Sequence, residues 1–403
     1  MFSSKTFAKK IFANLSTAII TYVELKDVSS LKEPSYINQW INKDDMENKV
    51  YTTKINMIMS LLLNGVKEGS TESELMSFLK ITDKISLNNR YLSELTYSNN
   101  VYNNIELHLK TAVYVQNSIE LTADFSSICI DNFYCSISKI DFRNKVHAAE
   151  TINSWIQETT NNKILDVISP VNIDEDTKIM LVNTAYLNSR WLDLTYKGKT
   201  EERKFHVSPS ESYLVPTIKF KKSTFFHGEI LHWNAKFIEI PFLDSSVTMT
   251  ILLPNEEVEP GNLGYLKKKF NFAEFQLFRT TYTFEQATVL YLPKFTSEYT
   301  RNITDFFRQK GVITMFEDNA DFTRLSKIPL KVNNIFQTIS MKINKGSSDA
   351  PYVIKKNTVR KPVGTPWELI VDRPFLYIIE VYGEMMFFGT VQTPDFMFMK
   401  DEL

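Results

Sequence analysis

The chain has 403 residues, of which 43% are hydrophobic and 13% aromatic, and its 46 basic and 47 acidic residues leave a formal net charge of −1. High apolar content with little net charge argues against disorder, and the balanced charges argue against a nucleic-acid-binding protein. No apolar run is long enough to span a bilayer, so no membrane span is expected.

The first predicted element is a helix over residues 5–23, because apolar residues recur every four positions from Phe7 to Ile19. The alternative is a signal peptide, since three lysines precede the apolar stretch. Three polar residues between positions 14 and 17 interrupt that stretch and favour the helix. Residues 24–49 are polar and irregular, and we interpret them as an insertion.

The next segments predict helices over 55–63, 71–79 and 148–159. An Asn64-Gly65 turn joins the first two. Glu72 and Glu74 occupy the first turn of the second helix, where the helix dipole favours acidic side chains. The third helix carries an apolar face, which is typical of a helix that packs on a larger core.

The rest of the chain is dominated by predicted strands. Short apolar or alternating runs predict them at 112–115, 137–142, 179–187, 214–220, 237–241, 247–253, 288–292, 369–371, 375–381 and 385–391. Helical stretches are expected around 121–134 and at 302–310. Helices followed by strands indicate an α+β fold with large, mainly antiparallel sheets.

The sequence offers little sign of catalysis. None of the five histidines stands at metal-ligand spacing with another His or Cys, and no hydrolase, zinc or phosphate-binding motif is present. We therefore expect no enzyme activity, no metal and no cofactor. Cys129 and Cys135 could close a small disulfide, but two buried free thiols are the favoured interpretation.

One long segment has no apolar periodicity. Residues 345–367 contain five basic residues and three prolines and precede the last apolar runs directly. A flexible basic segment between buried strands predicts an exposed loop that a protease can reach and cut.

The chain ends in Lys-Asp-Glu-Leu at 400–403, the signal that the retrieval receptor of the endoplasmic reticulum reads. The expected location is therefore the secretory pathway, either extracellular or in the lumen of the endoplasmic reticulum. No clear entry signal accompanies it.

The strand-rich half contains the run Leu-Val-Asn-Thr-Ala-Tyr-Leu at 181–187, followed by Trp191. This run resembles the signature of the serpin family of protease inhibitors at the third strand of sheet A, with its breach tryptophan. Further blocks in family order are 63–71, 152–156 with Thr159 and 163–164, 215–216, 240–242, 249–254, 292–295, 320–322, 372–375 and 388–391 with Pro394. The family's Phe-Ser-Pro is replaced near 50–54.

The resemblance implies a single serpin domain over 5–394, with helices packed around three β-sheets, an exposed reactive-centre loop at 345–365 and a tail at 395–403. It implies an inhibitor of trypsin-like serine endopeptidases that acts as a suicide substrate. The protease would cut the loop, which would then insert into sheet A as a new strand. The expected partner is a trypsin-like or convertase-like serine protease, and the protein is expected to be a monomer.

Two registers of the loop remain open. Counted from Gly346 as the hinge glycine, the scissile bond joins Arg360 to Lys361, and the inward positions are Ser347, Asp349, Pro351, Val353, Lys355 and Asn357. In the register shifted by one residue, cleavage follows Lys361, and the inward positions are Ser348, Ala350, Tyr352, Ile354, Lys356 and Thr358. The first register buries two charged residues, which is costly, and the second requires cleavage before Pro362.

The hinge departs from the inhibitory pattern of small residues. Its residues are Gly346, Ser347, Ser348, Asp349, Ala350 and Pro351. The alternative function is therefore a non-inhibitory serpin that acts as a binding protein or chaperone in the secretory pathway.

Overall fold

The computed structural model describes residues 49–52, 55–84, 105–191, 200–242, 246–255, 262–282, 284–344 and 367–394. The elements in chain order are β1 (Lys49–Thr52), α3 (Ile55–Asn64), α4 (Ser70–Leu79), β2 (Ile105–Gln116), α6 (Ala123–Ser127), η2 (Ile128–Asn132), β3 (Ser136–Ile140), α7 (Lys145–Thr159), η3 (Pro170–Asn172), β4 (Ile179–Arg190), β5 (Thr200–Ser208), β6 (Glu211–Ile230), η4 (Leu231–Trp233), β7 (Ala235–Pro241), β8 (Val247–Pro254), α8 (Leu263–Lys269), α9 (Phe272–Tyr282), β9 (Phe284–Pro293), β10 (Ser297–Asn302), α10 (Thr304–Gln309), η5 (Thr314–Phe316), β11 (Asn334–Asn344), β12 (Trp367–Ile370), β13 (Phe375–Val381) and β14 (Glu384–Val391).

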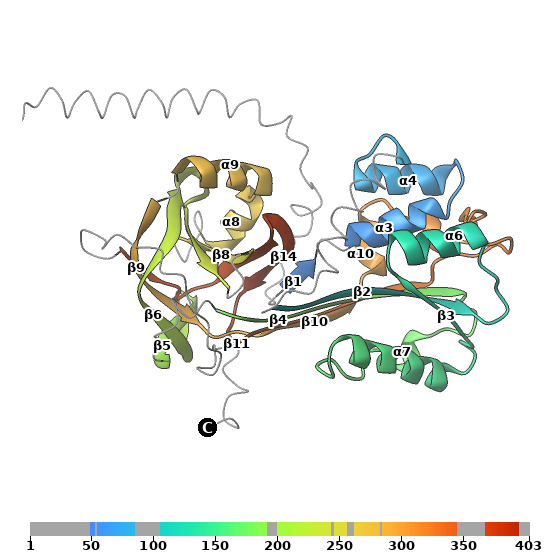
Figure 1. Cartoon of the computed structure of the whole chain (residues 1–403), viewed down its shortest axis with the longest axis horizontal. Helices are drawn as coiled ribbons and strands as arrows, with labels where there is room; N and C mark the ends of the chain where they lie inside the picture. Colours follow the sequence, from blue (N-terminus) through green and yellow to red (C-terminus); the bar gives the residue numbers. More distant parts are fainter. Residues whose placement is uncertain are drawn as a thin grey trace, which may run out of the picture.

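The described strands form two hydrogen-bonded sheets. The five-stranded sheet has the order β10-β11-β4-β2-β3, and the nine-stranded sheet has the order β1-β14-β13-β8-β7-β6-β9-β12, with β5 on β6. Strand β6 changes register on β9 between Phe220 and Ser223, and such irregularities bend a strand. Figure 1 shows β6 curving through the larger sheet. The expected α+β fold is confirmed, and the nine-stranded sheet corresponds to two of the three expected β-sheets, joined through β6.

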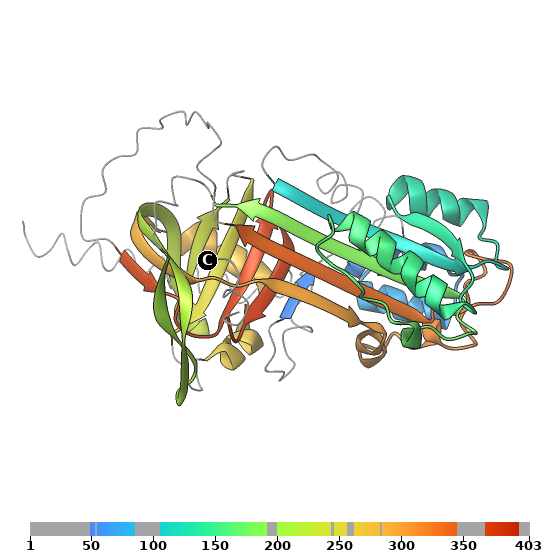
Figure 2. The same ribbon diagram turned by 90° about the horizontal axis from the view of Figure 1, so that it is seen from below.

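Helices cover both faces of the five-stranded sheet. Figure 1 shows α7 on one face and α3, α4, α6 and α10 on the opposite face. Figure 2 shows α7 lying over the long strands and running roughly along them. The apolar face predicted for this helix accounts for its position, because Ile152 and Ile156 are fully buried against Val182 and Tyr114 of the sheet.

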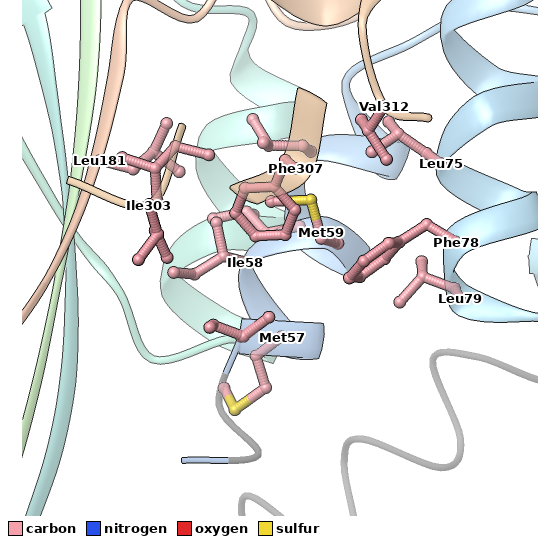
Figure 3. Close-up of a cluster of buried hydrophobic side chains, with 14 of the residues drawn as sticks. Met57, Ile58, Met59, Leu75, Phe78, Leu79, Leu181, Ile303, Phe307 and Val312 are labelled. Carbon is pink, nitrogen blue, oxygen red and sulfur yellow. The ribbon is translucent and has the colours of Figure 1, made fainter. Parts of the chain in front are cut away.

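Helix α3 lies in the centre of the other helical layer. Its residues from Ile55 to Leu63 are all buried, so other parts of the protein surround it on every side. Figure 3 shows Ile58 and Met59 pointing toward Phe307 of α10, with Leu181 of β4 beyond them. The rings of Phe78 and Phe307 meet edge to face at 5.3 Å between centroids. The predicted helices 55–63 and 71–79 are thus confirmed as α3 and α4.

Glu74 has a different partner from the one its position predicts. It accepts hydrogen bonds from the backbone N–H groups of Ile313 (2.7 Å) and Thr314 (2.8 Å) at the start of η5. Its carboxylate therefore caps another helix rather than its own and ties α4 to η5. Glu72 remains in the first turn of α4, as predicted.

Several predicted elements extend further than the sequence indicated, and others were missed. The strand expected at 214–220 is part of the 20-residue β6. Helices α8 and α9 and strands β5, β10 and β11 were not predicted. The helix expected at 5–23 and nearly all of the insertion at 24–49 lie outside the described residues. Among the described helices, none is long and apolar enough to cross a membrane.

The prediction of two free thiols is wrong. Cys129 and Cys135 form a disulfide, with their Cα atoms 5.4 Å apart. The turn that ends η2 brings them together, because the backbone N–H of Cys135 donates to the carbonyl of Cys129 at 2.9 Å. A separation of six residues is compatible with a disulfide and with two free thiols. The local turn brings the two cysteines close enough to form the disulfide.

Two buried acids share one arginine beneath α9. The guanidinium of Arg279 lies 2.6 Å from Glu380 of β13 and 3.5 Å from Glu239 of β7. The side chain of Glu380 is 1% exposed and that of Glu239 is 13% exposed. Burial raises the pKa of Glu239 to about 7 despite Arg279, and the neighbouring Glu380 adds to the rise. One cation cannot compensate two buried carboxylates, so Glu239 keeps a proton near neutral pH.

This proton predicts how stability depends on pH. Between about pH 4.5 and 7 the folded chain holds a proton on Glu239 that the unfolded chain releases, so this group's contribution falls as the pH rises through that window. The loss amounts to at most about 3 kcal/mol. Glu239→Gln imitates the protonated form. The difference in free energy of unfolding between this variant and the wild type should therefore favour the variant more at pH 8 than at pH 5. Urea unfolding at both pH values measures the difference.

Glu202→Gln is the matched control, because Glu202 is an exposed acid on β5 of the same sheet. It should leave the pH dependence of the wild type unchanged. If Glu239→Gln also follows the wild-type dependence, Glu239 does not hold the proton.

Candidate functional site

The predicted loop residues lie outside the described residues. These are the reactive-bond pair Arg360 and Lys361 and the hinge residues Gly346, Ser347, Ser348, Asp349, Ala350 and Pro351. The elements on either side are described. Strand β11 ends at Asn344 in the five-stranded sheet, and β12 begins at Trp367 in the nine-stranded sheet. The segment 345–366 therefore connects two different sheets.

The centre of the five-stranded sheet is a seam, by which we mean the pairing of β4 with β11. The two strands run parallel and pair without interruption from Asn334 with Met180 to Asn344 with Arg190. Their outer neighbours β2 and β10 are antiparallel to them. A chain that left β11 at Asn344 and turned back between the two strands would run antiparallel to both. The seam is thus a position where one extra strand fits the direction of both neighbours.

Two buried amides face each other across the seam. Asn183 of β4 pairs in register with Gln337 of β11, and both residues are fully buried. Asn183 Nδ2 donates to the Lys110 carbonyl at 3.1 Å and to Thr111 Oγ1 at 3.0 Å. Within the described part of the chain, Asn183 Oδ1 and both polar atoms of the Gln337 amide have no hydrogen-bond partner. Unsatisfied buried polar atoms cost about 1–3 kcal/mol each, so they weaken the seam.

Trp191 stands at the end of the seam where the predicted loop begins. Because Arg190 pairs with Asn344, Trp191 lies one residue beyond the last pair. Its indole is 1% exposed and stacks on Phe242 at 4.7 Å between centroids and 3° between planes. Phe220 contacts it edge to face at 5.8 Å. Trp191 thereby joins the end of β4 to the nine-stranded sheet, and its role as the breach residue stays a prediction.

A second aromatic contact marks the other end of the predicted loop. Trp367, the first residue of β12, stacks face to face on His227 of β6, with 4.0 Å between ring centroids and 8° between planes. Strand β12 is the edge of its sheet and pairs with β9 in parallel over four residues. The two ends of the segment 345–366 are therefore flanked by buried or partly buried tryptophans.

The described residues contain no group of three or more His, Cys, Asp or Glu side chains that could hold a metal ion. Of the histidines, His232 lies 2.7 Å from Glu274, and His108 lies 3.6 Å from Glu106. These are ordinary pairs at partly exposed positions.

No local sequence pattern indicated the amides of the seam or the His227–Trp367 stack. Asn183 and Gln337 lie 154 positions apart, so only the pairing of β4 with β11 brings them together. A buried polar residue at an inward position of an apolar strand is the one signal that could have drawn attention to Asn183.

Comparisons with known proteins agree with this geometry. The sequence model of the family described as "Serpin (serine protease inhibitor)" matches residues 35–394. The chain is 28% identical to "Antitrypsin" of Bombyx mori over 329 residues, which cover 80% of this chain and 82% of that protein. It is also 28% identical to "Antichymotrypsin-2" of the same organism over 331 residues, which cover 80% and 85%. Among solved structures, Serpin48 of the insect Tenebrio molitor matches with a TM-score of 0.73 at 24% identity, covering 90% of this chain and 99% of that one.

The unsatisfied amide of Gln337 predicts that an apolar side chain would serve the intact sheet better. Gln337→Met keeps a similar length and removes two unpaired polar atoms. We expect the free energy of unfolding to rise by about 1–2 kcal/mol, measured by urea denaturation of the uncut protein. Gln157→Met, at an exposed position of α7, is the matched control and should have little effect. A loss of stability in Gln337→Met would show that this amide is satisfied.

Proposed function

The chain belongs to the serpin family of protease inhibitors, and we propose that it inhibits trypsin-like serine endopeptidases as a suicide substrate. In this proposal the segment 345–366 is the bait, and its cut N-terminal part enters the seam between β4 and β11. The protein acts by a change of its own structure and not as a catalyst.

The observation that carries the proposal is the parallel seam itself. An added strand would replace one parallel pairing by two antiparallel pairings, which are slightly more stable per residue. It would also bring new backbone and side-chain groups beside Asn183 Oδ1 and the Gln337 amide, which lack hydrogen-bond partners in the described part of the chain. The five-stranded sheet therefore has a physical reason to accept a sixth strand.

The chemistry of the bait follows from the order of the chain. The protease serine attacks the carbonyl carbon of the scissile residue, and the peptide nitrogen of the next residue leaves as an amine. The protease is then joined by an ester to the C-terminal end of the piece that follows β11. Insertion of that piece carries the bound protease along the sheet before water can hydrolyse the ester.

The basic residues support a trypsin-like target. Arg360 and Lys361 are adjacent, and a trypsin-like protease has an aspartate at the base of its specificity pocket. Relatives named for action against trypsin and against chymotrypsin match this chain at the same identity. The specificity therefore rests on the loop residues themselves. A convertase-like protease is included, because Arg360 and Lys361 form a basic pair of the general kind that convertases cut.

The two loop registers differ in which step they favour. Cleavage between Arg360 and Lys361 would turn Asp349 and Lys355 inward, whereas cleavage after Lys361 would turn Ala350 and Tyr352 inward. In the first register, burial of charged side chains slows insertion and gives water more time to release the protease. The second register requires cleavage before Pro362. Because each register disfavours one of the two steps, we retain the second candidate, a non-inhibitory binding protein or chaperone.

Incubation with trypsin separates the two candidates. Inhibition predicts a covalent complex that survives denaturing electrophoresis, and cleaved protein that unfolds at a temperature at least about 10 °C above that of the uncut protein, because the sheet has gained a strand. Thermal unfolding before and after limited cleavage measures the second point. Complete cleavage with no complex and no gain in unfolding temperature would contradict inhibition and support the binding protein.

Two variants locate the scissile bond. If cleavage follows Arg360, Arg360→Gln should abolish the complex with trypsin, and Lys361→Gln should retain it. The reverse result assigns the bond after Lys361. Mass spectrometry of the released C-terminal peptide gives the same assignment independently, and neither variant alters a described contact of the fold.

A further inference from the structure

Strand β12, which follows the segment 345–366, makes few contacts with its sheet. It has four residues, and among the described strands it lies at the edge of its sheet and pairs with β9 alone, from Trp367 with Thr288 to Ile370 with Tyr291. Its C-terminal end is anchored, because Leu369 and Val371 are 3% exposed and the Val371 N–H donates to the Tyr291 carbonyl at 2.9 Å. Its N-terminal end starts with a partly buried Trp367 and an exposed Glu368.

The ring of His227 supports that N-terminal end. The centroid distance of 4.0 Å and the angle of 8° place the imidazole and the indole in full face contact. His227 belongs to β6, and β6 and β12 lie on either side of β9 in the order of the sheet. The stack therefore ties the edge strand to the second strand inward, across β9. His227 is 6% exposed, and burial lowers its pKa, so the ring is neutral at neutral pH and stacks without the cost of a buried charge.

The length of the uncut segment 345–366 determines whether it could insert fully while the N-terminal end of β12 stays on β9. Twenty-two residues separate Asn344 from Trp367. A strand as long as the 11-residue β11 spans about 36 Å, and an uncut chain that ran this far along the seam would have to return the same distance. Two such passages with their turns need more than 22 residues. Full insertion without cleavage therefore requires the N-terminal end of β12 to leave β9.

We propose that His227 is a positioning residue that holds Trp367, and with it the start of β12, on the nine-stranded sheet. It thereby keeps the uncut segment out of the seam. The first part of this inference concerns β12 alone, and the second part rests on the proposed function.

A pair of variants separates the aromatic contact from other properties of the histidine. His227→Phe keeps a flat ring against Trp367, and His227→Gln keeps polarity and similar length but removes the ring. Hydrogen exchange of the full-length protein, read by mass spectrometry on peptides covering 367–370, reports the opening of β12 directly. We expect exchange there to be about tenfold faster in His227→Gln and within about twofold of wild type in His227→Phe. His147→Gln, at an exposed position of α7, is the control.

Equal exchange at 367–370 in His227→Gln and wild type would overturn the positioning role, whatever the protein does to proteases. General destabilisation is recognised because it would accelerate exchange in β13 and β14 as well, and that result would also overturn the specific role.

The link to the uncut segment has its own measurement. After incubation at 37 °C without protease, His227→Gln should lose its capacity to form the trypsin complex several-fold faster than His227→Phe, and the incubated protein should unfold at a higher temperature. Faster exchange in β12 without that change would overturn the claim that β12 keeps the segment out. A wild type that forms no complex at all contradicts the proposed function, and the exchange comparison still decides the role of His227.

Discussion

The parallel pairing of β4 with β11 is the constraint on which the rest of this structure depends. It lies inside the five-stranded sheet and brings two fully buried amides, Asn183 and Gln337, into register. No hydrogen bond joins these two amides. Elsewhere the core is closely filled by apolar residues of α3 and its neighbours. The pairing of β4 with β11 thus carries unsatisfied buried polar atoms, which is the property that the proposed insertion would use.

The two described sheets are connected at the end of the seam where Arg190 pairs with Asn344. Trp191 packs the end of β4 against Phe242, and the stack of His227 on Trp367 holds the start of β12. The intervening segment 345–366 starts in one sheet and ends in the other. The two proposals therefore place this segment between a sheet that would accept a strand and a sheet that would hold the end of the segment in place.

Local sequence patterns predicted some elements of this fold and missed others. Local signals located α3, α4 and α7: the Asn64-Gly65 turn separates the first two helices, and an apolar face marks the third. Helices α8 and α9 were missed, although they bury Leu266 and Phe275, since aromatic and basic residues interrupt their periodicity. The state of Cys129 and Cys135 depended on a turn, and the partner of Glu74 lies about 240 residues further along the chain.

The amino-acid sequence by itself determined the α+β class and the family, because ordered motifs and local periodicity are properties of neighbouring residues. Only the tertiary structure decided that β4 and β11 are parallel neighbours, that Arg279 serves both Glu239 and Glu380, and that His227 meets Trp367. Each of these depends on strand order and register. Those are set by packing between segments far apart in the chain, and no local pattern encodes them.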